Sequence, residues 1–171
     1  MVKKAEAIFG LSGSWVKNSK IFGRVLFIQN DINSSVKVKV EIVGLPNGEH
    51  GFHVHEKKLT PKLLKYSDCC NKLGGHFNGS KSIWKPDNLD GTKHGKHVGD
   101  LCFNLNSKNS KVIKNFVDNK ISLYKSSPNC IIERSLIIHE KKDDKGLGKN
   151  NESLITGNAG KRIACTNINL I

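Results

Sequence analysis

The sequence predicts an all-β protein, an antiparallel sandwich or barrel of about eight short strands with long functional loops. Short apolar and β-branched runs recur along the chain between Gly, Ser and Asn, which is the pattern of strands joined by turns. One run alternates strictly between apolar and charged residues, and no convincing helical period appears. Irregular segments at residues 56–96 and 140–160 are longer than ordinary connections, and such loops usually carry function.

The expected strands follow one another through most of the chain. They cover residues 2–10, 22–29, 36–42, 49–56, 98–105, 112–117, 121–124 and 130–138. In the third of them, valine and isoleucine alternate with Lys37, Lys39 and Glu41, which predicts one buried face and charges in solvent. Turn residues at 45–48 lead directly into the strand at 49–56.

The composition indicates one soluble domain over residues 1–171. With 37% hydrophobic and 25% charged residues, the chain is close to ordinary globular usage. No apolar run is long enough to span a bilayer and no secretory signal is visible, so we expect a cytoplasmic protein without membrane contact. The abundance of Lys, Asn and Ile is compatible with an AT-rich genome; for a viral source, the location would be the host cytoplasm.

The formal net charge of +13 raises the question of nucleic-acid binding. The cations are nearly all lysines spread along the chain, with arginine only at positions 24, 134 and 162 and no interleaved aromatic residues. This pattern argues against a nucleic-acid partner. It favours attraction of small anions, an effect that salt should weaken.

The strand expected at residues 49–56 contains the sequence EHGFHVHE. Side chains alternate along a strand, so His53 and His55 project from one face while Phe52 and Val54 point to the other. Two imidazoles fixed on a rigid strand form half of a metal site, and the apolar pair behind them holds their direction.

Apart from His50, which lies on the same expected strand, the other histidines lie in or beside the long loops, whereas core histidines would be scattered. The seven histidines are at positions 50, 53, 55, 76, 94, 97 and 139. With Asp100 and Asp143 in the same regions, they suggest a metal, since imidazoles alone suit copper or zinc and imidazoles with one carboxylate suit zinc. A cupin site also begins with His-x-His on a strand, but the acidic residue that it needs is replaced by Leu59 and Thr60.

Five short motifs give the chain its resemblance to a known family. They are GFHVHE at 51–56, GHFN at 75–78, HVGD at 97–100, IIHEK at 137–141 and GNAGKRIAC at 157–165. In these motifs the chain resembles the copper/zinc superoxide dismutases, and the resemblance covers essentially the whole sequence. It implies an eight-stranded antiparallel Greek-key barrel or sandwich of the immunoglobulin-like kind.

Carried over position by position, the resemblance implies ligands for two metals. Copper would be held by His53, His55, His76 and His139. Zinc would be held by His76, His94, His97 and Asp100, with His76 bridging the ions. The other implied roles are a carboxylate that links copper and zinc ligands (Asp143), a substrate-orienting cation (Arg162), a residue that narrows the channel (Thr156) and a disulfide between Cys70 and Cys165.

The implied activity is dismutation of superoxide to oxygen and hydrogen peroxide by copper(II)/copper(I) cycling. Arg162 and His76 would be the catalytic residues, and the chain would act as a homodimer that receives its metal from a copper donor protein. The alternative is an inactive metal-binding homologue, such as a decoy, a copper-chaperone-like domain or a copper store. Loss of a copper histidine or of the arginine would be its sign.

The chain departs from the family pattern in its zinc loop and in its cysteines. His94 lies farther from His76 and nearer to His97 than the family pattern has it, and we still assign His94 to zinc. The five cysteines form no Cys-x-x-Cys pair, which excludes a zinc ribbon or a thioredoxin-like site. Cys69 stands next to Cys70 and competes with it as a disulfide partner, while Cys102 and Cys130 are expected to be free thiols.

Overall fold

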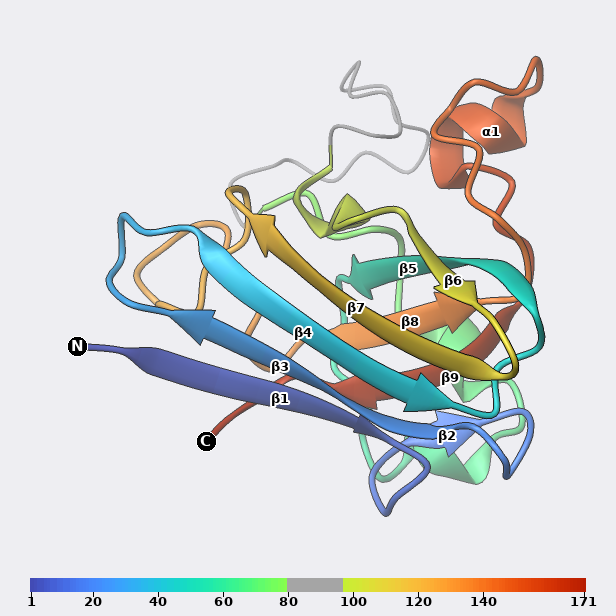
Figure 1. The fold of residues 1–171 in the computed structure, drawn as a ribbon, viewed down its shortest axis with the longest axis horizontal. Helices are drawn as coiled ribbons and strands as arrows, with labels where there is room; N and C mark the ends of the chain where they lie inside the picture. The colour runs from blue at the N-terminus through green and yellow to red at the C-terminus, as the bar shows by residue number, and fades with distance from the viewer. Residues whose placement is uncertain (80–96) are drawn as a thin grey trace.

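The computed structural model of the chain describes residues 1–79 and 97–171, in which two antiparallel sheets pack face to face (Figure 1). One sheet has the order β10-β1-β3-β4-β7 and consists of β1 (Lys3–Phe9), β3 (Phe22–Gln29), β4 (Val36–Val43), β7 (Lys111–Asp118) and β10 (Asn169–Leu170). The other has the order β2-β9-β8-β5-β6 and consists of β2 (Trp15–Val16), β5 (Gly48–His55), β6 (Asn104–Ser107), β8 (Ser135–His139) and β9 (Arg162–Asn167).

This architecture confirms the predicted all-β sandwich. Eight of the strands have four or more residues, while β2 and β10 are two-residue additions at the sheet edges. The chain passes from one sheet to the other between β4 and β5 and again between β6 and β7, as Greek-key connections do. Among the described residues, no strand pairing joins the two sheets, so the fold is an open sandwich and not a closed barrel.

Several segments differ from the expected strands. Residues 98–100 form a 3-10 turn, η3 (Val98–Asp100), and residues 121–124 and 130–134 contribute only an isolated bridge between Ser122 and Cys130. Side chains and scattered carbonyls both serve as partners here: Gln29 accepts the N–H of Leu123 at 2.7 Å, and the carbonyl of Asn129 accepts the N–H of Ser122 at 3.0 Å. The N–H groups of Ile131 and Glu133 donate to the carbonyls of Ser122 at 2.9 Å and Ile168 at 2.8 Å, so these bonds form no regular ladder with one neighbouring strand.

The loops also contain short helices that the sequence reading missed. They are η1 (Leu63–Lys65), η2 (Cys69–Lys72) and α1 (Asn151–Thr156). Helix α1 begins at the Asn150 side chain, which accepts the N–H of Ser153 at 2.8 Å, and ends at Gly157 in the left-handed region with φ of 68°. None of the helices among the described residues is long and apolar enough to cross a bilayer.

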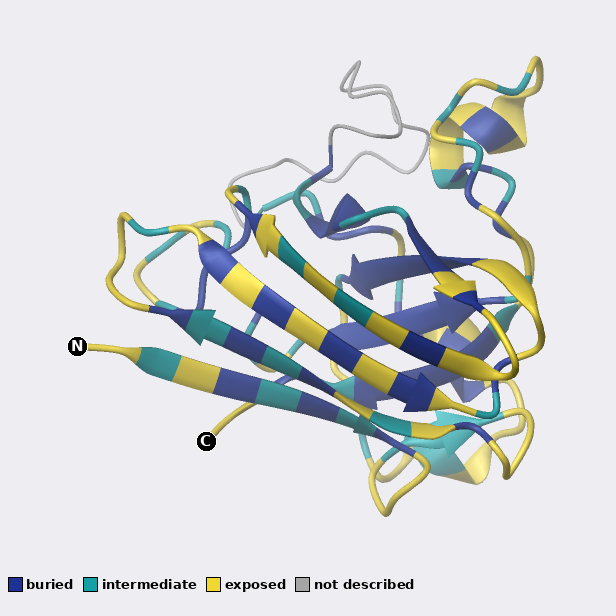
Figure 2. Ribbon diagram, viewed as in Figure 1, coloured by how far each residue is buried: buried dark blue, intermediate teal, exposed yellow. Residues whose placement is uncertain are grey.

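Burial follows the predicted alternation in the β10-β1-β3-β4-β7 sheet, which we call the outer sheet. Along β4, Val36, Val38, Val40 and Ile42 are buried while Lys37, Lys39 and Glu41 are exposed, and Figure 2 shows this alternation as stripes along the ribbon. In contrast, the last six residues of β5 and all of β8 are buried. Described residues of the segments that follow β5 and β8 pack on the outer face of these strands, for example Leu73 beside Ile137 and Asp143 against His53, so the histidine strand lies inside the molecule.

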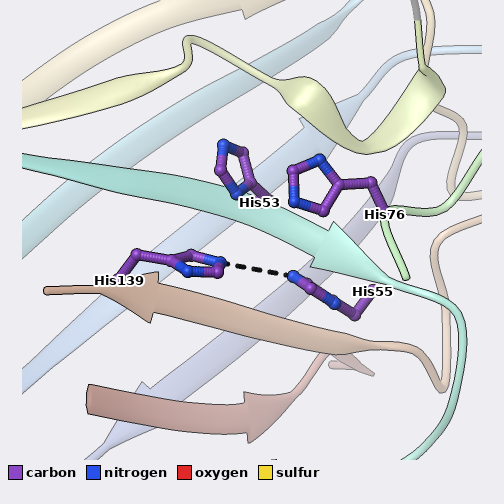
Figure 3. A group of neighbouring side chains, drawn as sticks. All are labelled: His53, His55, His76 and His139. Carbon is purple, nitrogen blue, oxygen red and sulfur yellow. Dashed lines mark hydrogen bonds between the residues drawn. The ribbon is translucent and has the colours of Figure 1, made fainter. Parts of the chain in front are cut away.

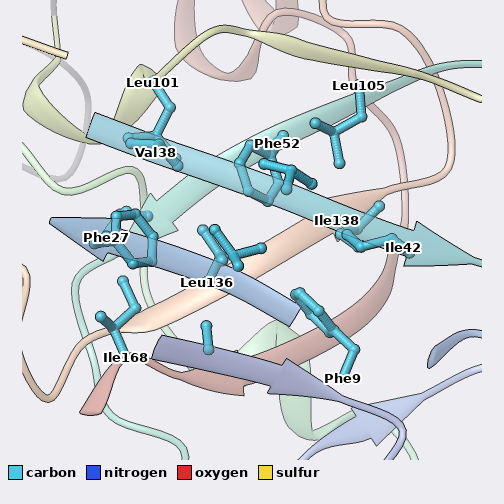
Figure 4. Packing of buried hydrophobic residues seen from close by; sticks show 14 of the residues in the cluster. Phe9, Phe27, Val38, Ile42, Phe52, Leu101, Leu105, Leu136, Ile138 and Ile168 are labelled. Carbon is cyan, nitrogen blue, oxygen red and sulfur yellow. The ribbon is translucent and has the colours of Figure 1, made fainter. Parts of the chain in front are cut away.

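The main core lies between the sheets. Figure 4 shows Phe9 and Phe27 from one sheet meeting Phe52, Leu136 and Ile138 from the other. A second, smaller cluster lies under the loop that follows β5 and consists of Leu59, Cys69, Cys70, Leu73, Ile137 and Cys165. Because Ile137 and Ile138 point to opposite faces of β8, this strand supports both the core and the loop.

Candidate metal centre

Strands β5 and β8 direct three histidines to one place. Alternation along β5 sends Phe52 and Val54 into the core and leaves His53 and His55 on the loop side. Strand β8 lies antiparallel to β5 and ends at His139, after an irregularity in its pairing with β9. Rigid neighbouring strands therefore fix the positions of these imidazoles.

The loop after β5 delivers a fourth histidine to the same place. His76 forms an isolated bridge with His55, and the N–H of Phe77 donates to the carbonyl of Val54 at 2.9 Å. The carbonyl of Phe77 in turn accepts the N–H of Gly99 at 2.6 Å. A Cβ on Gly99 would lie 2.3 Å from the Val54 carbonyl oxygen, so only glycine allows this close approach.

The four imidazoles form one buried cluster (Figure 3). One ligand nitrogen of each lies within 4.8 Å of those of the other three, and the cluster consists of His53, His55, His76 and His139. The rings of His53 and His76 approach to 4.0 Å between centroids, and none of the four residues is more than 8% exposed. Buried imidazole nitrogens need hydrogen-bond partners or a ligand in place of water.

The hydrogen bonds of His55 and His139 show that this cluster fits a metal ion. Their Nδ1 atoms donate to the carbonyls of Gly74 at 3.0 Å and Gly160 at 3.1 Å, so in the neutral rings each Nε2 carries a lone pair. These two Nε2 atoms face each other at 3.4 Å. With metal–nitrogen distances of about 2.0–2.1 Å, two ligands of one ion can stand about 3–4 Å apart, so a shared cation relieves the repulsion between the lone pairs.

Burial lowers the basicity of the same two rings. It lowers the pKa of His139 to about 3, and burial together with the Arg162 charge lowers the pKa of His55 well below 6.5. Both rings are therefore neutral at physiological pH, which is the form in which imidazole binds a metal.

This result gives a pH prediction for the metal-free protein. The unfolded chain takes up protons on His139 below about 6.5, whereas the folded chain does so only near 3. The unfolded state thus binds more protons in this window. The free energy of unfolding should therefore decrease as the pH falls from about 6.5 to about 3. Denaturant unfolding of the apoprotein across this range checks the prediction, and equal midpoints at the two ends would contradict it.

A carboxylate orients His53 from behind. The Nε2 atom of His53 donates to Oδ2 of Asp143 at 2.6 Å, and both side chains are fully buried. The amide of Asn104 holds the main chain of Asp143 at both ends, accepting its N–H at 2.8 Å and donating to its carbonyl at 2.9 Å. Such a partner fixes the tautomer and direction of an imidazole ligand.

His76 also belongs to a second group of ligands, with His97 and Asp100. Nδ1 of His76 donates to Oδ1 of Asp100 at 2.8 Å, and the main-chain N–H of His97 donates to Oδ2 at 3.0 Å. Although burial raises the pKa of Asp100, hydrogen bonds from the two imidazoles hold it below its usual value. The predicted ligand His94 lies outside the described residues.

Arg162 stands at the start of β9, next to this centre. Its guanidinium donates to the carbonyls of Cys70 and Gly74, both at 2.7 Å, and burial lowers its pKa to about 10. The group therefore stays charged at neutral pH. The carbonyl of Gly74 also accepts from His55, so it connects the arginine with the imidazole cluster.

The remaining predicted site residues lie in the loops. Cys70 and Cys165 are joined in a disulfide that ties η2 to β9 across 95 residues of sequence. Cys69, Cys102 and Cys130 are free. Thr156, the last residue of α1, has its hydroxyl bonded to the carbonyl and carboxylate of Glu152.

Sequence reasoning missed two residues that shape the centre. A Cβ on Gly51 would lie 2.9 Å from Cβ of Ala159 and 3.1 Å from Cε1 of His53, so glycine is required for the loop to pack here. Asn104 carries no sequence signal of its role, because an isolated asparagine in a strand has many explanations. His50 is buried, and its ring nitrogens contact the carbonyls of His139 at 2.9 Å and Pro46 at 3.0 Å.

Two buried donor groups that share one imidazole, on a β sandwich, are the arrangement expected of a metalloprotein with two neighbouring sites for transition metals. Known proteins have the same sequence pattern. The family described as "Copper/zinc superoxide dismutase (SODC)" matches residues 21–168. The superoxide dismutase (Cu-Zn) 5 of Dictyostelium discoideum is 39% identical over 150 residues, which cover 88% of this chain and 91% of the relative.

Two further similarities agree with this match. The extracellular superoxide dismutase (Cu-Zn) of Drosophila melanogaster is 40% identical over 152 residues, covering 86% of this chain and 75% of the relative. The crystal structure of the clock protein EA4 superposes with a TM-score of 0.75 and 35% identity, covering 98% of this chain and 94% of that one.

The chain belongs to the copper/zinc superoxide dismutase family. It is an oxidoreductase that uses copper and zinc to dismute superoxide to oxygen and hydrogen peroxide. The alternative of an inactive homologue has no observation in its favour, because all four clustered imidazoles and Arg162 are present.

Proposed function

We propose that the two donor groups divide the metals between them within a single domain, residues 1–171. Copper is bound by His53, His55, His76 and His139, and zinc by His76, His94, His97 and Asp100. The place of His76 carries this assignment, because its ring belongs to both groups and its Nδ1 faces Asp100. A set of imidazoles alone suits copper, and the carboxylate of the other set suits zinc.

The metals supply what side chains cannot: bound copper provides a one-electron change between copper(II) and copper(I), while redox-silent zinc organises the loop. The residues of the chain attract the anion and carry protons. Nε2 of His76 takes up a proton after the first superoxide has left as oxygen. It donates this proton as the second superoxide becomes hydrogen peroxide, and water supplies the other proton.

Arg162 is the residue proposed to bind superoxide beside the imidazoles. Two carbonyls fix its guanidinium, so the charge is oriented before the anion arrives. Exposed lysines on the segment 140–161 extend the positive field; they are Lys141, Lys142, Lys145, Lys149 and Lys161. Thr156 is proposed to narrow the approach, and its bonds to Glu152 hold its side chain in one orientation.

Removal of the Arg162 charge tests this role. Arg162→Ala should lower kcat/KM for superoxide roughly ten- to hundredfold at unchanged copper content, since a charged hydrogen bond is lost. Arg162→Lys should recover part of the activity because it keeps a cation. Arg24→Ala is the matched control, since Arg24 lies in β3 and pairs with Glu6 at 2.8 Å. Equal kcat/KM for Arg162→Ala and the unsubstituted chain would refute the role.

The zinc assignment of His94 has its own test. His94→Ala should lose zinc, because three remaining ligands cannot complete the tetrahedral set that zinc prefers. Metal analysis after dialysis measures the zinc content of the variant, and copper content serves as the internal control. Unchanged zinc in His94→Ala would show that another group completes the site.

A homodimer and a copper donor protein are proposed as partners. Val2, Leu170 and Ile171 are exposed where the chain ends meet at the β1–β10 edge, which offers apolar surface for a second copy. The imidazoles are at most 8% exposed, so a donor protein can assist the delivery of copper to them. Sedimentation of the metal-loaded protein should give twice the chain mass of 18.9 kDa, and a single-chain mass would contradict the dimer.

The cytoplasm is the proposed location. Three thiols lie outside the disulfide, namely Cys69, Cys102 and Cys130, and unpaired thiols are typical of reducing compartments. Fractionation of cells that produce the chain tests this location. Recovery from the medium would favour the location that the name of the Drosophila relative gives.

A further inference from the structure

Three cysteines meet under the loop that follows β5. Cys69 and Cys70 begin η2, and Cys165 lies on β9. The three sulfur atoms all lie within 4.8 Å of one another, although only Cys70 and Cys165 are bonded. All three residues are at most 2% exposed and share one apolar cluster with Leu73 and Ile137.

We infer that Cys69 is a second disulfide partner of Cys165, so that the chain has two interchangeable cross-links between η2 and β9. The sulfur of Cys69 is already within reach of the bond, and the surrounding apolar cluster excludes competing thiols from solvent. Consecutive residues of a 3-10 turn point about 120° apart, so a rotation of η2 exchanges the cysteine that faces β9.

The exchange needs no oxidant or reductant. The thiolate of Cys69 attacks Sγ of Cys165, a Cys69–Cys165 bond forms, and the Cys70–Cys165 bond breaks. Cys70 leaves as a thiolate and takes up the proton that Cys69 gave up, so one disulfide and one thiol remain. Burial raises the pKa of the Cys69 thiol, which keeps this thiol mostly protonated and makes the exchange slow at neutral pH.

The position of the cross-link bears on the active site through Arg162. The carbonyl of Cys70 accepts both the guanidinium of Arg162 at 2.7 Å and the N–H of Leu73 at 3.3 Å. A rotation of η2 that brings Cys69 to β9 turns this carbonyl away. The Cys69–Cys165 form therefore holds the arginine through the carbonyl of Gly74 alone.

Disulfide mapping of Cys70→Ser tests the inference independently of activity. The folded variant is first oxidised in air, and it is then denatured in acid and alkylated to label its free thiols. Cys69 should be bonded to Cys165, and only Cys102 and Cys130 should be alkylated. Alkylation of both Cys69 and Cys165 in the folded variant would overturn the inference. Cys69→Ser is the matched control and should keep the Cys70–Cys165 bond.

The unsubstituted chain decides the matter if Cys70→Ser does not fold. Cleavage after Lys65 and Lys72 leaves Cys69 and Cys70 on one peptide, so fragmentation between them locates the alkylated sulfur. After incubation at alkaline pH, part of the peptide should carry the alkyl group on Cys70 in place of Cys69. Alkylation of Cys69 alone after this incubation would overturn the inference.

Activity gives a second readout of the same exchange. Cys70→Ser with the Cys69–Cys165 bond should have kcat/KM lowered roughly three- to tenfold at full copper content, because Arg162 loses one of its two carbonyl partners. Cys69→Ser should match the unsubstituted chain. Equal activity of a bridged Cys70→Ser would contradict the link to Arg162.

Discussion

His139→Ala should abolish copper-dependent superoxide dismutation, with a loss of at least about a hundredfold, because removal of second-sphere partners alone already costs 10- to 100-fold at metal sites. The imidazole of His139 is fixed by its bond to Gly160 and faces Nε2 of His55, so its removal breaks the cluster at its closest contact. Pulse-radiolysis or coupled-assay rates, together with copper analysis, measure the effect.

The control for this substitution is Val117→Ala, which removes an exposed side chain from the outer sheet. It should retain copper and activity. A His139→Ala protein that binds copper fully and remains active would refute the assignment of His139, whereas a fully loaded but inactive unsubstituted chain would refute the enzyme itself.

Of the cysteine substitutions, Cys165→Ser should cause the largest decrease in the free energy of unfolding. Its disulfide with Cys70 spans 95 residues, and a loop of that length is worth about 4–5 kcal/mol in the chain-entropy model. Domains of this kind are stable by about 5–15 kcal/mol in total, so a large share would be lost. Denaturant unfolding of the metal-free protein under non-reducing conditions measures the difference.

Cys130→Ser is the matched control, since Cys130 takes no part in a disulfide. Its unfolding midpoint should equal that of the unsubstituted chain. Equal midpoints for Cys165→Ser would contradict the expected contribution of the cross-link. Cys70→Ser should lie nearer to the unsubstituted chain than Cys165→Ser does, because Cys69 replaces the missing partner.

The regular strands and the first half of the site could be predicted from the sequence. Alternation of valine with lysine in β4 gave its buried and exposed faces, and the same period placed His53 and His55 together on β5. Both patterns are local, because a period of two residues is a property of the extended backbone itself. The strand expected at 121–124 and the first half of the one expected at 130–138 are wrong for the opposite reason. Their hydrogen-bond partners, such as Gln29 for Leu123 and the carbonyl of Ile168 for Glu133, lie far away in sequence and form no regular ladder.

The sequence by itself determined the class of fold, the histidine strand and, through its motifs, the family. Only the tertiary structure decided which nitrogen of His53 and of His55 is held by the protein, because the partner groups, Asp143 and the carbonyl of Gly74, come from distant loops. It likewise brought Cys69 within reach of the disulfide and gave Arg162 its two carbonyl partners. Residue spacing encodes local geometry, whereas loops receive their positions from the strands and side chains on which they pack.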